Sequence, residues 1–326
     1  MTKKWITGID IGHYSAKAVV LMVDGATLTV INHLELAGSD AIFSDSHTLK
    51  HQETVKNLKN FKKLPPIFRK KAALAIPDSA VISKIISIEK GLVGQEQEFA
   101  VLQAMSHQTP YPLEELALDF YKASPISEGH TEAYRVYVVK QSLVDNWSKT
   151  INKLGYQPQY MDTNINALRG LQGMLSHQQD VFDGWGILDI GRQQAALCPP
   201  KTMPLEMAKQ WLYDTTRQHD QLANVVKQKS EAEQAFEQVA SKVMSQIQLY
   251  RSLPGGQGME GLLVCGGHAN APQFVDFIER KLGMPVRPLA LHNAVAVSSK
   301  ETTLLSGSFA VALGVAYNAS QWMETH

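Results

Sequence analysis

Two cysteines are all that this chain of 326 residues contains, and no apolar run approaches the roughly 18 residues that a membrane-spanning helix needs. Cys198 and Cys265 each end an apolar stretch, and neither has a second cysteine or a histidine at the spacing of a metal site. We therefore expect both to be reduced thiols in a hydrophobic core, as in a cytoplasmic protein. The 11 histidines are scattered along the chain, so we expect no histidine-based metal centre.

A surplus of charge is also missing, because 31 Lys and Arg residues face 31 Asp and Glu residues. This balance argues against a protein that lives by binding nucleic acid, which usually carries a basic excess. No apolar leader follows the first residues, so we expect any location at a membrane to depend on a partner. With 44% hydrophobic and 19% charged residues, the chain is expected to be soluble and globular, with room for two domains.

The stretch from residue 5 to residue 22 predicts two strands joined by a tight turn. Asp10 ends the first strand, and Gly12 allows the sharp turn. Ser15 and Lys17 alternate on the second strand and should face the same side. A carboxylate, a hydroxyl, an ammonium and turn N–H groups suit a phosphate chain with its Mg²⁺. The alternative is an ordinary hairpin that happens to carry Asp-x-Gly.

A second copy of this pattern favours the phosphate interpretation. Residues 186–198 repeat the design, with Asp189 and Gly191 in the places of the first Asp and Gly. Two such hairpins half a chain apart predict a duplicated fold whose halves face one another. A third element follows near the end, where an apolar strand at 262–265 runs into Gly266-Gly267, glycines that let backbone approach a ring or a sugar closely.

Between these motifs the pattern predicts alternating strands and helices. Residues 81–139 form a small α/β insert, and residues 201–213 show no clear pattern. The other predicted strands are 28–34, 71–76, 160–162 and a short one at Val286. The predicted helices are 51–61, 141–154, 164–175, 222–253, 270–282 and 308–319.

The order of these motifs resembles the PilM family, the actin-like proteins of type IV pilus assembly that are related to the cell-division protein FtsA. The pilus-associated MshI and HofM proteins fit less specifically. The residues that carry the resemblance are 8–12 with Ser15 and Lys17, 85–88, 118–120, Gly155 before 161–162, 167–168, 188–191, 266–269, 281–283 with Val286, and 309–314.

The resemblance implies an α/β fold of the actin-like ATPase (ribonuclease H-like) type, with two lobes and an FtsA-like inserted subdomain. Lobe 1 would cover residues 1–180 with its insert at about 78–140, and lobe 2 would cover 181–326, with the last helix (about 308–319) able to return to lobe 1. It further implies ATP and Mg²⁺ between the lobes. The expected partner is the cytoplasmic N-terminal peptide of a PilN-like inner-membrane protein, alongside other pilus platform proteins, and self-association is possible for such a fold.

Site residues also follow from the resemblance. Asp10, Asp162 and Asp189 would lie near the metal ion. Gly12 would give backbone donors to the phosphates, and the glycine pair would pass beneath the adenosine. The full set implied for the nucleotide is Asp10, Gly12, His13, Ser15, Lys17, Asp189, Gly191, Gly266, Gly267 and His268. We identify no catalytic residue, and we expect any ATPase activity to be slow or absent.

Three departures from the family pattern leave a second reading open. His13 and Tyr14 replace small residues in the first turn, and Ala195 stands where a threonine usually closes the second phosphate motif. These changes fit a scaffold that keeps the fold and the partners but has lost the nucleotide. A small-molecule kinase of the same fold is a further alternative, although no residue offers itself as its base.

Individual residues carry alternatives too. Lys17 can be read as a strand lysine that extends its ammonium to solvent. Asp162 can be read as the N-cap of the helix at 164–175. The glycine pair can be read as a simple strand-to-helix turn.

Overall fold

The computed structural model describes residues 3–38, 42–45, 47–66, 68–123, 129–176, 182–191, 194–212, 225–252, 258–267, 272–298 and 305–325. His268, one of the expected nucleotide residues, lies outside these ranges. Within them, no helix is long and apolar enough to cross a bilayer.

The first sheet has six strands in the order β14-β3-β2-β1-β4-β8. Its three central antiparallel strands form a meander, and β4 and β8 extend it in parallel to β1. The bounds are β1 Lys4–Ile11, β2 Ser15–Asp24, β3 Thr27–Ala37, β4 Lys71–Ile76, β8 Gln157–Thr163 and β14 Ala296–Val297.

The second sheet repeats this plan in the order β11-β10-β9-β12-β13. Again three antiparallel strands are followed by two parallel ones. The bounds are β9 Trp185–Ile190, β10 Gln194–Cys198, β11 Lys209–Leu212, β12 Gly261–Cys265 and β13 Val286–Pro288. The duplication expected from the two hairpins is therefore confirmed.

Two elements were missed from the sequence. β11 is the outer strand of the second sheet, and its burial follows no alternation, so residues 201–213 gave no strand signal. β14 is only two residues long and returns the chain to the edge of the first sheet, parallel to β3.

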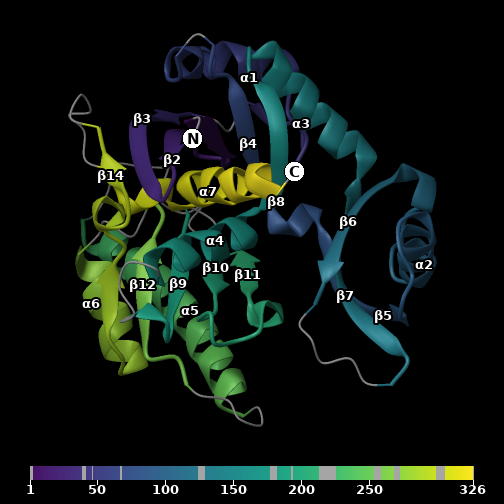
Figure 1. Ribbon diagram of the computed structural model, residues 1–326. Helices are drawn as coiled ribbons and strands as arrows, with labels where there is room; N and C mark the ends of the chain where they lie inside the picture. The colour runs from purple at the N-terminus through teal and green to yellow at the C-terminus, as the bar shows by residue number, and fades with distance from the viewer. Residues whose placement is uncertain are drawn as a thin grey trace.

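Helices separate and cover the two sheets in layers (Figure 1). α4 (Asn164–Ser176) and α7 (Ala310–Thr325) lie between the sheets. α1 (His51–Asn57) and α3 (Gln141–Lys153) cover the outer face of the first sheet, and α5 (Val225–Arg251) and α6 (Pro272–Leu282) cover that of the second. α7 is the predicted last helix (308–319), and it runs six residues further, to Thr325.

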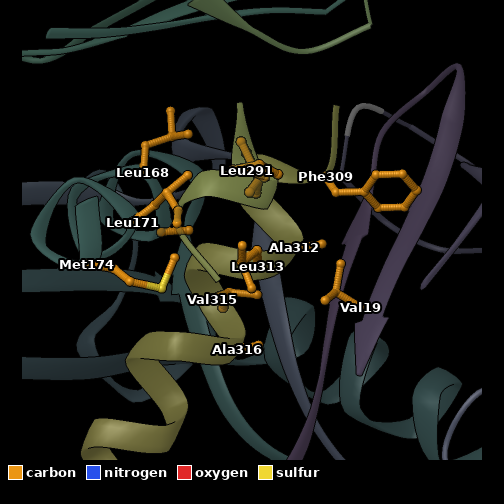
Figure 2. Close-up of a cluster of buried hydrophobic side chains, with 14 of the residues drawn as sticks. Val19, Leu168, Leu171, Met174, Leu291, Phe309, Ala312, Leu313, Val315 and Ala316 are labelled. Atoms are coloured by element: carbon orange, nitrogen blue, oxygen red, sulfur yellow. The ribbon is translucent and has the colours of Figure 1, made fainter. Parts of the chain in front are cut away.

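A single core joins the sheets through α4 and α7. Figure 2 shows its centre, where Leu168 and Leu171 of α4 lie on one side of α7, near Leu313, and Val19 of β2 lies on the other side. Gly8 and Gly314 permit this packing. A Cβ at Gly8 would overlap the Ala312 carbonyl oxygen, and one at Gly314 would overlap the Ala167 carbonyl oxygen. The helix backbone therefore lies directly on β1 and on α4.

The predicted insert is a separate three-stranded sheet, with the strand order β5-β7-β6. It consists of β5 (Ile82–Glu89), α2 (Gln95–Ser106), β6 (Leu116–Lys122) and β7 (Thr131–Lys140). α2 packs on one face of this sheet through its own small core, which includes Val101 and Met105. Figure 1 shows the insert standing to the side of both main sheets.

Candidate functional site

The first hairpin folds as the sequence predicts. Asp10 of β1 lies opposite Lys17 of β2, and residues 12–14 make the turn. The Gly12 N–H donates to the Ser15 carbonyl oxygen (3.1 Å) and so closes the turn from within. This N–H is used within the turn, and the role of Gly12 as a donor to the phosphates stays a prediction. Its place at the turn is as predicted.

Lys17 is held by polar partners inside the protein. Its Nζ donates to the Ser15 Oγ (2.9 Å) and lies 3.8 Å from Glu35 Oε1, and only 11% of the side chain is exposed. The predicted common face of Ser15 and Lys17 is confirmed, and a lysine that merely extends to solvent does not fit this burial. Sequence reasoning missed Glu35. Only the pairing register of β2 and β3, which sets Lys17 opposite Glu35, would have revealed it.

The second hairpin closes in the same way as the first. The Gly191 N–H donates to the Gln194 carbonyl oxygen (2.9 Å), so this glycine too uses its donor within the turn. Ala195 is buried in β10, opposite Ile190. The two turns thus share geometry as well as sequence.

Strand alternation aims both aspartates at the space between the sheets. On β1 the side chain of Ile6 enters the core shared by the sheets, and Gly8 and Asp10 follow on the same face. On β9 the side chains of Trp185 and Ile187 enter that core, and Asp189 follows them. The predicted facing arrangement therefore results from the period of each strand.

The charges of Asp10 and Asp189 act on one another. Burial first, and then the neighbouring Asp10 carboxylate, raise the pKa of the Asp189 carboxyl to about 6, against the lowering effects of Lys17 and of the hydrogen bond from Cys265. Burial likewise raises the pKa of Asp10, with Lys17 lowering it and Glu35 raising it. Three carboxyl groups thus share one ammonium, an arrangement that leaves excess negative charge for a cation to neutralise.

This grouping fits Mg²⁺ better than a metal held by many side chains. Among the described residues, no cluster of three or more His, Cys, Asp and Glu side chains could hold a metal ion directly. Mg²⁺ keeps several of its waters and needs few protein ligands when phosphates supply the others. Two facing carboxylates, Asp10 and Asp189, are therefore suited to a hydrated Mg²⁺ that arrives with a nucleotide.

Gly266 brings the end of β12 against the second hairpin. Its φ is +91°, and a Cβ there would run into the Ile190 carbonyl oxygen and the Asp189 carboxylate. The thiol of Cys265 donates to Asp189 Oδ1 (3.7 Å), a contact that sequence reasoning did not foresee when it placed this cysteine in the core. Apart from its neighbours in the chain, no atom of the described residues lies within 4 Å of the position of a Cβ on Gly267. The glycine pair therefore joins the site, and its adenosine role stays a prediction.

Asp162 lies in a different polar cluster. Its carboxylate accepts hydrogen bonds from Tyr160 Oη (2.9 Å), Asn166 Nδ2 (2.7 Å), Asn318 Nδ2 (3.3 Å) and the Thr163 N–H (2.8 Å). The charged groups that act on Asp10 and Asp189 do not include it. The structure thus does not bring Asp162 together with the other two aspartates, and a metal role for it stays a prediction.

The N-cap alternative for Asp162 is also corrected. Thr163 Oγ1 accepts from the Asn166 N–H (3.2 Å), and the Asp78 carboxylate accepts from the Ile165 N–H (3.2 Å), so these two side chains cap α4. Burial raises the pKa of Asp78 to about 7.

Of the two bulky turn residues of the first hairpin, one packs on an aromatic ring and the other is partly exposed. The His13 ring lies against the Phe43 ring with centroids 4.2 Å apart, and Tyr14 is half exposed. That His13 contacts the nucleotide, and that His13 and Tyr14 crowd its phosphates, both stay predictions.

Comparison with known proteins places these features in one family. A family model described as "Type IV pilus assembly protein PilM" matches residues 8–198, more than half of the chain. No curated protein sequence matches it.

Solved structures share the fold. One is a "PilM-PilN type IV pilus biogenesis complex", with a TM-score of 0.76 at 17% identity over 96% of this chain and 98% of that chain. Another is the ethanolamine utilization protein EutJ from Carboxydothermus hydrogenoformans, with a TM-score of 0.54 at 13% identity over 97% of this chain and 90% of that chain.

Proposed function

Because the chain belongs to the PilM family of type IV pilus assembly proteins, we propose that it binds Mg²⁺-ATP between its two hairpins and captures a PilN-like membrane protein. Its fold is the bilobed α/β actin-like ATPase fold that the sequence predicts, with an inserted subdomain. We place it in the cytoplasm, at the inner membrane through that partner, within the pilus assembly platform.

The observation that carries the nucleotide proposal is that Asp10 and Asp189 end equivalent strands on the faces turned toward the core between the sheets, where the Asp10 carboxylate raises the pKa of Asp189. Two buried like charges at the ends of facing strands are costly, and they are retained where a cation is to be bound. Bound Mg²⁺ would neutralise phosphate charge and bridge the lobes. Asp10 and Asp189 would hold its waters, Lys17 with Ser15 would meet the phosphates, and Gly266 and Gly267 would lie under the adenosine.

Lobe boundaries belong to this proposal as well. We assign lobe 1 to residues 1–180 and lobe 2 to 181–326. The support is that the second sheet draws on residues 185–288 alone, whereas the first draws on 4–163 with β14 added. α7 packs on β1, β2 and β4, which supports its return to lobe 1.

The nucleotide-free scaffold is the second candidate. The internal hydrogen bonds of Gly12 and Gly191 favour it, because these N–H groups are already used inside the turns. Both candidates keep the same partners, so nucleotide binding itself separates them.

Thermal unfolding with and without Mg²⁺-ATP is the experiment that decides. A ligand that binds only the folded state raises the midpoint, and at about ten times its dissociation constant it adds about 1.4 kcal/mol of stability. We expect a rise of a few degrees that Asp10→Ala abolishes. Asp24→Ala, at the far end of β2 in a surface ion pair with Lys3, is the control that should keep the rise. No rise at millimolar nucleotide would establish the scaffold instead.

For the partner, the described part of the insert offers two strand edges and a partly exposed sheet face opposite α2. β5 and β6 each have an unpaired edge to which an extended peptide can add as a further strand. On the face opposite α2, Ile85 and Tyr121 flank Arg135 and are about half exposed (46% and 52%). These features support a groove for the peptide at this face.

An ion pair connects the insert to lobe 2. The buried guanidinium of Arg135 pairs with Glu206, in a short turn of helix (Leu205–Met207) that follows β10. That turn is tied to α5 by the Tyr250 hydroxyl, which donates to the Met207 carbonyl oxygen. A change of the second hairpin on nucleotide binding therefore has a physical route to the peptide face.

Acidic substitutions test the peptide face. We expect Ile85→Asp and Tyr121→Asp each to lower the affinity for a synthetic N-terminal peptide of the PilN-like protein about tenfold, because each removes apolar contact area. Phe99→Asp is the matched control, since Phe99 is 69% exposed on α2 at the other face of the insert. Fluorescence anisotropy gives the affinities. Equal losses in all three variants, or none, would contradict the groove.

A further inference from the structure

A continuous basic segment, residues 56–71, precedes β4. The whole stretch from residue 54 to residue 77 contains no aspartate or glutamate, although the chain as a whole is neutral. Six of its basic residues are exposed and Lys70 is partly buried. The seven are Lys56, Lys59, Lys62, Lys63, Arg69, Lys70 and Lys71.

No acidic side chain neutralises these charges within the described part of the chain. The ion pairs of that part involve other basic residues, such as Lys4 with Glu324 and Lys149 with Asp145. The side-chain nitrogen of Lys70 instead donates to the Lys62 carbonyl oxygen (2.6 Å), and that of Lys71 lies 4.0 Å from the Met323 sulfur. The segment therefore presents uncompensated positive charge to solvent.

The basic segment also contains an exposed aromatic side chain. Phe68 is 94% exposed, the highest value among the large hydrophobic side chains of the described residues. It sits on a turn closed by the Arg69 N–H, which donates to the Pro66 carbonyl oxygen (2.8 Å).

The residues that lead into this turn are anchored in the protein. Phe61, Leu64 and Pro65 are buried, and the Tyr156 hydroxyl donates to the Phe61 carbonyl oxygen (2.5 Å). The exposed Phe68 side chain thus follows an anchored stretch of chain, with basic residues on both sides of it in the sequence.

The basic segment lies at the end of the first sheet that is remote from the nucleotide hairpins. β4 begins at Lys71, whereas its fifth residue, Ala75, is the one that pairs with Asp10. Figure 1 shows α1, which leads into the segment, at the opposite end of the molecule from α5. Contact through the segment would leave the hairpins and the insert accessible.

We propose that the basic segment, with Phe68 as its apolar tip, docks on the surface of a membrane rich in anionic phospholipid. Ammonium groups are attracted to the negative surface potential, and an aromatic ring gains free energy by entering the interface. Lysines outnumber arginine six to one in the segment, whereas arginine is the side chain favoured for nucleic-acid phosphates. This surface adds a direct contact to a membrane location that the sequence assigned wholly to a partner.

Vesicle flotation with the full chain tests the proposal. Vesicles of phosphatidylcholine with about 30% phosphatidylglycerol should bind the protein, and pure phosphatidylcholine should not. We expect K59Q/K63Q/R69Q to weaken binding about a hundredfold, because each basic residue near such a surface contributes about fivefold. Phe68→Ser should weaken it about tenfold through lost apolar contact. Binding should also fall at about 0.5 M salt, where screening is strong.

The control removes the same charge elsewhere. K84Q/K209Q/K242Q neutralises three exposed lysines outside the segment and should bind vesicles like the unaltered protein. Circular dichroism and the unfolding midpoint confirm that all variants fold. Equal losses in both triple variants would show a general charge effect and overturn the proposal. Duplex DNA or RNA binding without vesicle binding would overturn it as well.

Discussion

Replacing Gly314 by alanine is expected to destabilise the protein by about 3 kcal/mol or more, with Gly314→Val failing to fold. The added carbon would overlap the carbonyl oxygen of Ala167, which belongs to the backbone of α4 and has no rotamer by which to move aside. α7 would have to separate from α4 and from β1, and the core that joins the sheets would open. Gly8→Ala should act similarly, because Ala312 stands over Gly8 in the same way.

Gly173→Ala in α4 is the matched control. A Cβ there meets only the flexible end of Lys201 at 3.7 Å, so the substitution should be neutral or stabilise by up to about 1 kcal/mol through helix propensity. Urea unfolding followed by circular dichroism measures all four variants. A Gly314→Ala protein as stable as the Gly173→Ala protein would mean that α7 does not lie where the structure has it.

Replacing Asp189 by asparagine is expected to stabilise the folded protein above pH 6 and to abolish its response to Mg²⁺-ATP. The pKa of Asp189 rises on folding from 3.8 to about 6, so this group takes up a proton on folding between those values. Its contribution to stability therefore falls as the pH rises from about 4 through 6, and the penalty persists at neutral pH. Asparagine carries no such penalty, and we expect a gain of about 1 to 3 kcal/mol at pH 7.5.

The pH profile separates this cause from others. The stability difference between Asp189→Asn and the unaltered protein should shrink as the pH falls from 6 and vanish below about pH 3, where the aspartate is protonated in both the folded and the unfolded state. The midpoint rise with Mg²⁺-ATP in the unaltered protein should likewise fade below pH 6, because the protonated carboxyl cannot attract the cation. An asparagine variant that is less stable at every pH would show that the carboxylate stabilises the fold, contrary to the account.

The hairpins, the duplication and the insert could be predicted from the sequence alone, because strand alternation and Asp-x-Gly turns are local signals. Asp10 and Asp189 face the same space since each follows core residues at a period of two, a pattern legible in the chain. β11 and β14 were not predicted. β11 is a short outer strand whose burial does not alternate, and β14 has only two residues.

What the sequence could not supply depends on partners distant in the chain. Glu35 meets Lys17 only through the register of β2 with β3. The hydrogen-bond partners of Asp162 could not be predicted either, because Asn318 from α7 and Asn166 from α4 converge on its carboxylate. Phe68 reads in sequence as one more apolar residue, and only its exposure reveals an unpartnered tip.

Calorimetric titration of ATP, in excess Mg²⁺ at pH 7.5, into the unaltered protein, Asp10→Asn, Asp189→Asn and the double variant tests the central claim most directly. If the two hairpins form one site, either single substitution removes nearly all of the binding, and the double variant loses little more than each single one. A double variant that binds Mg²⁺-ATP as tightly as the unaltered protein would contradict it.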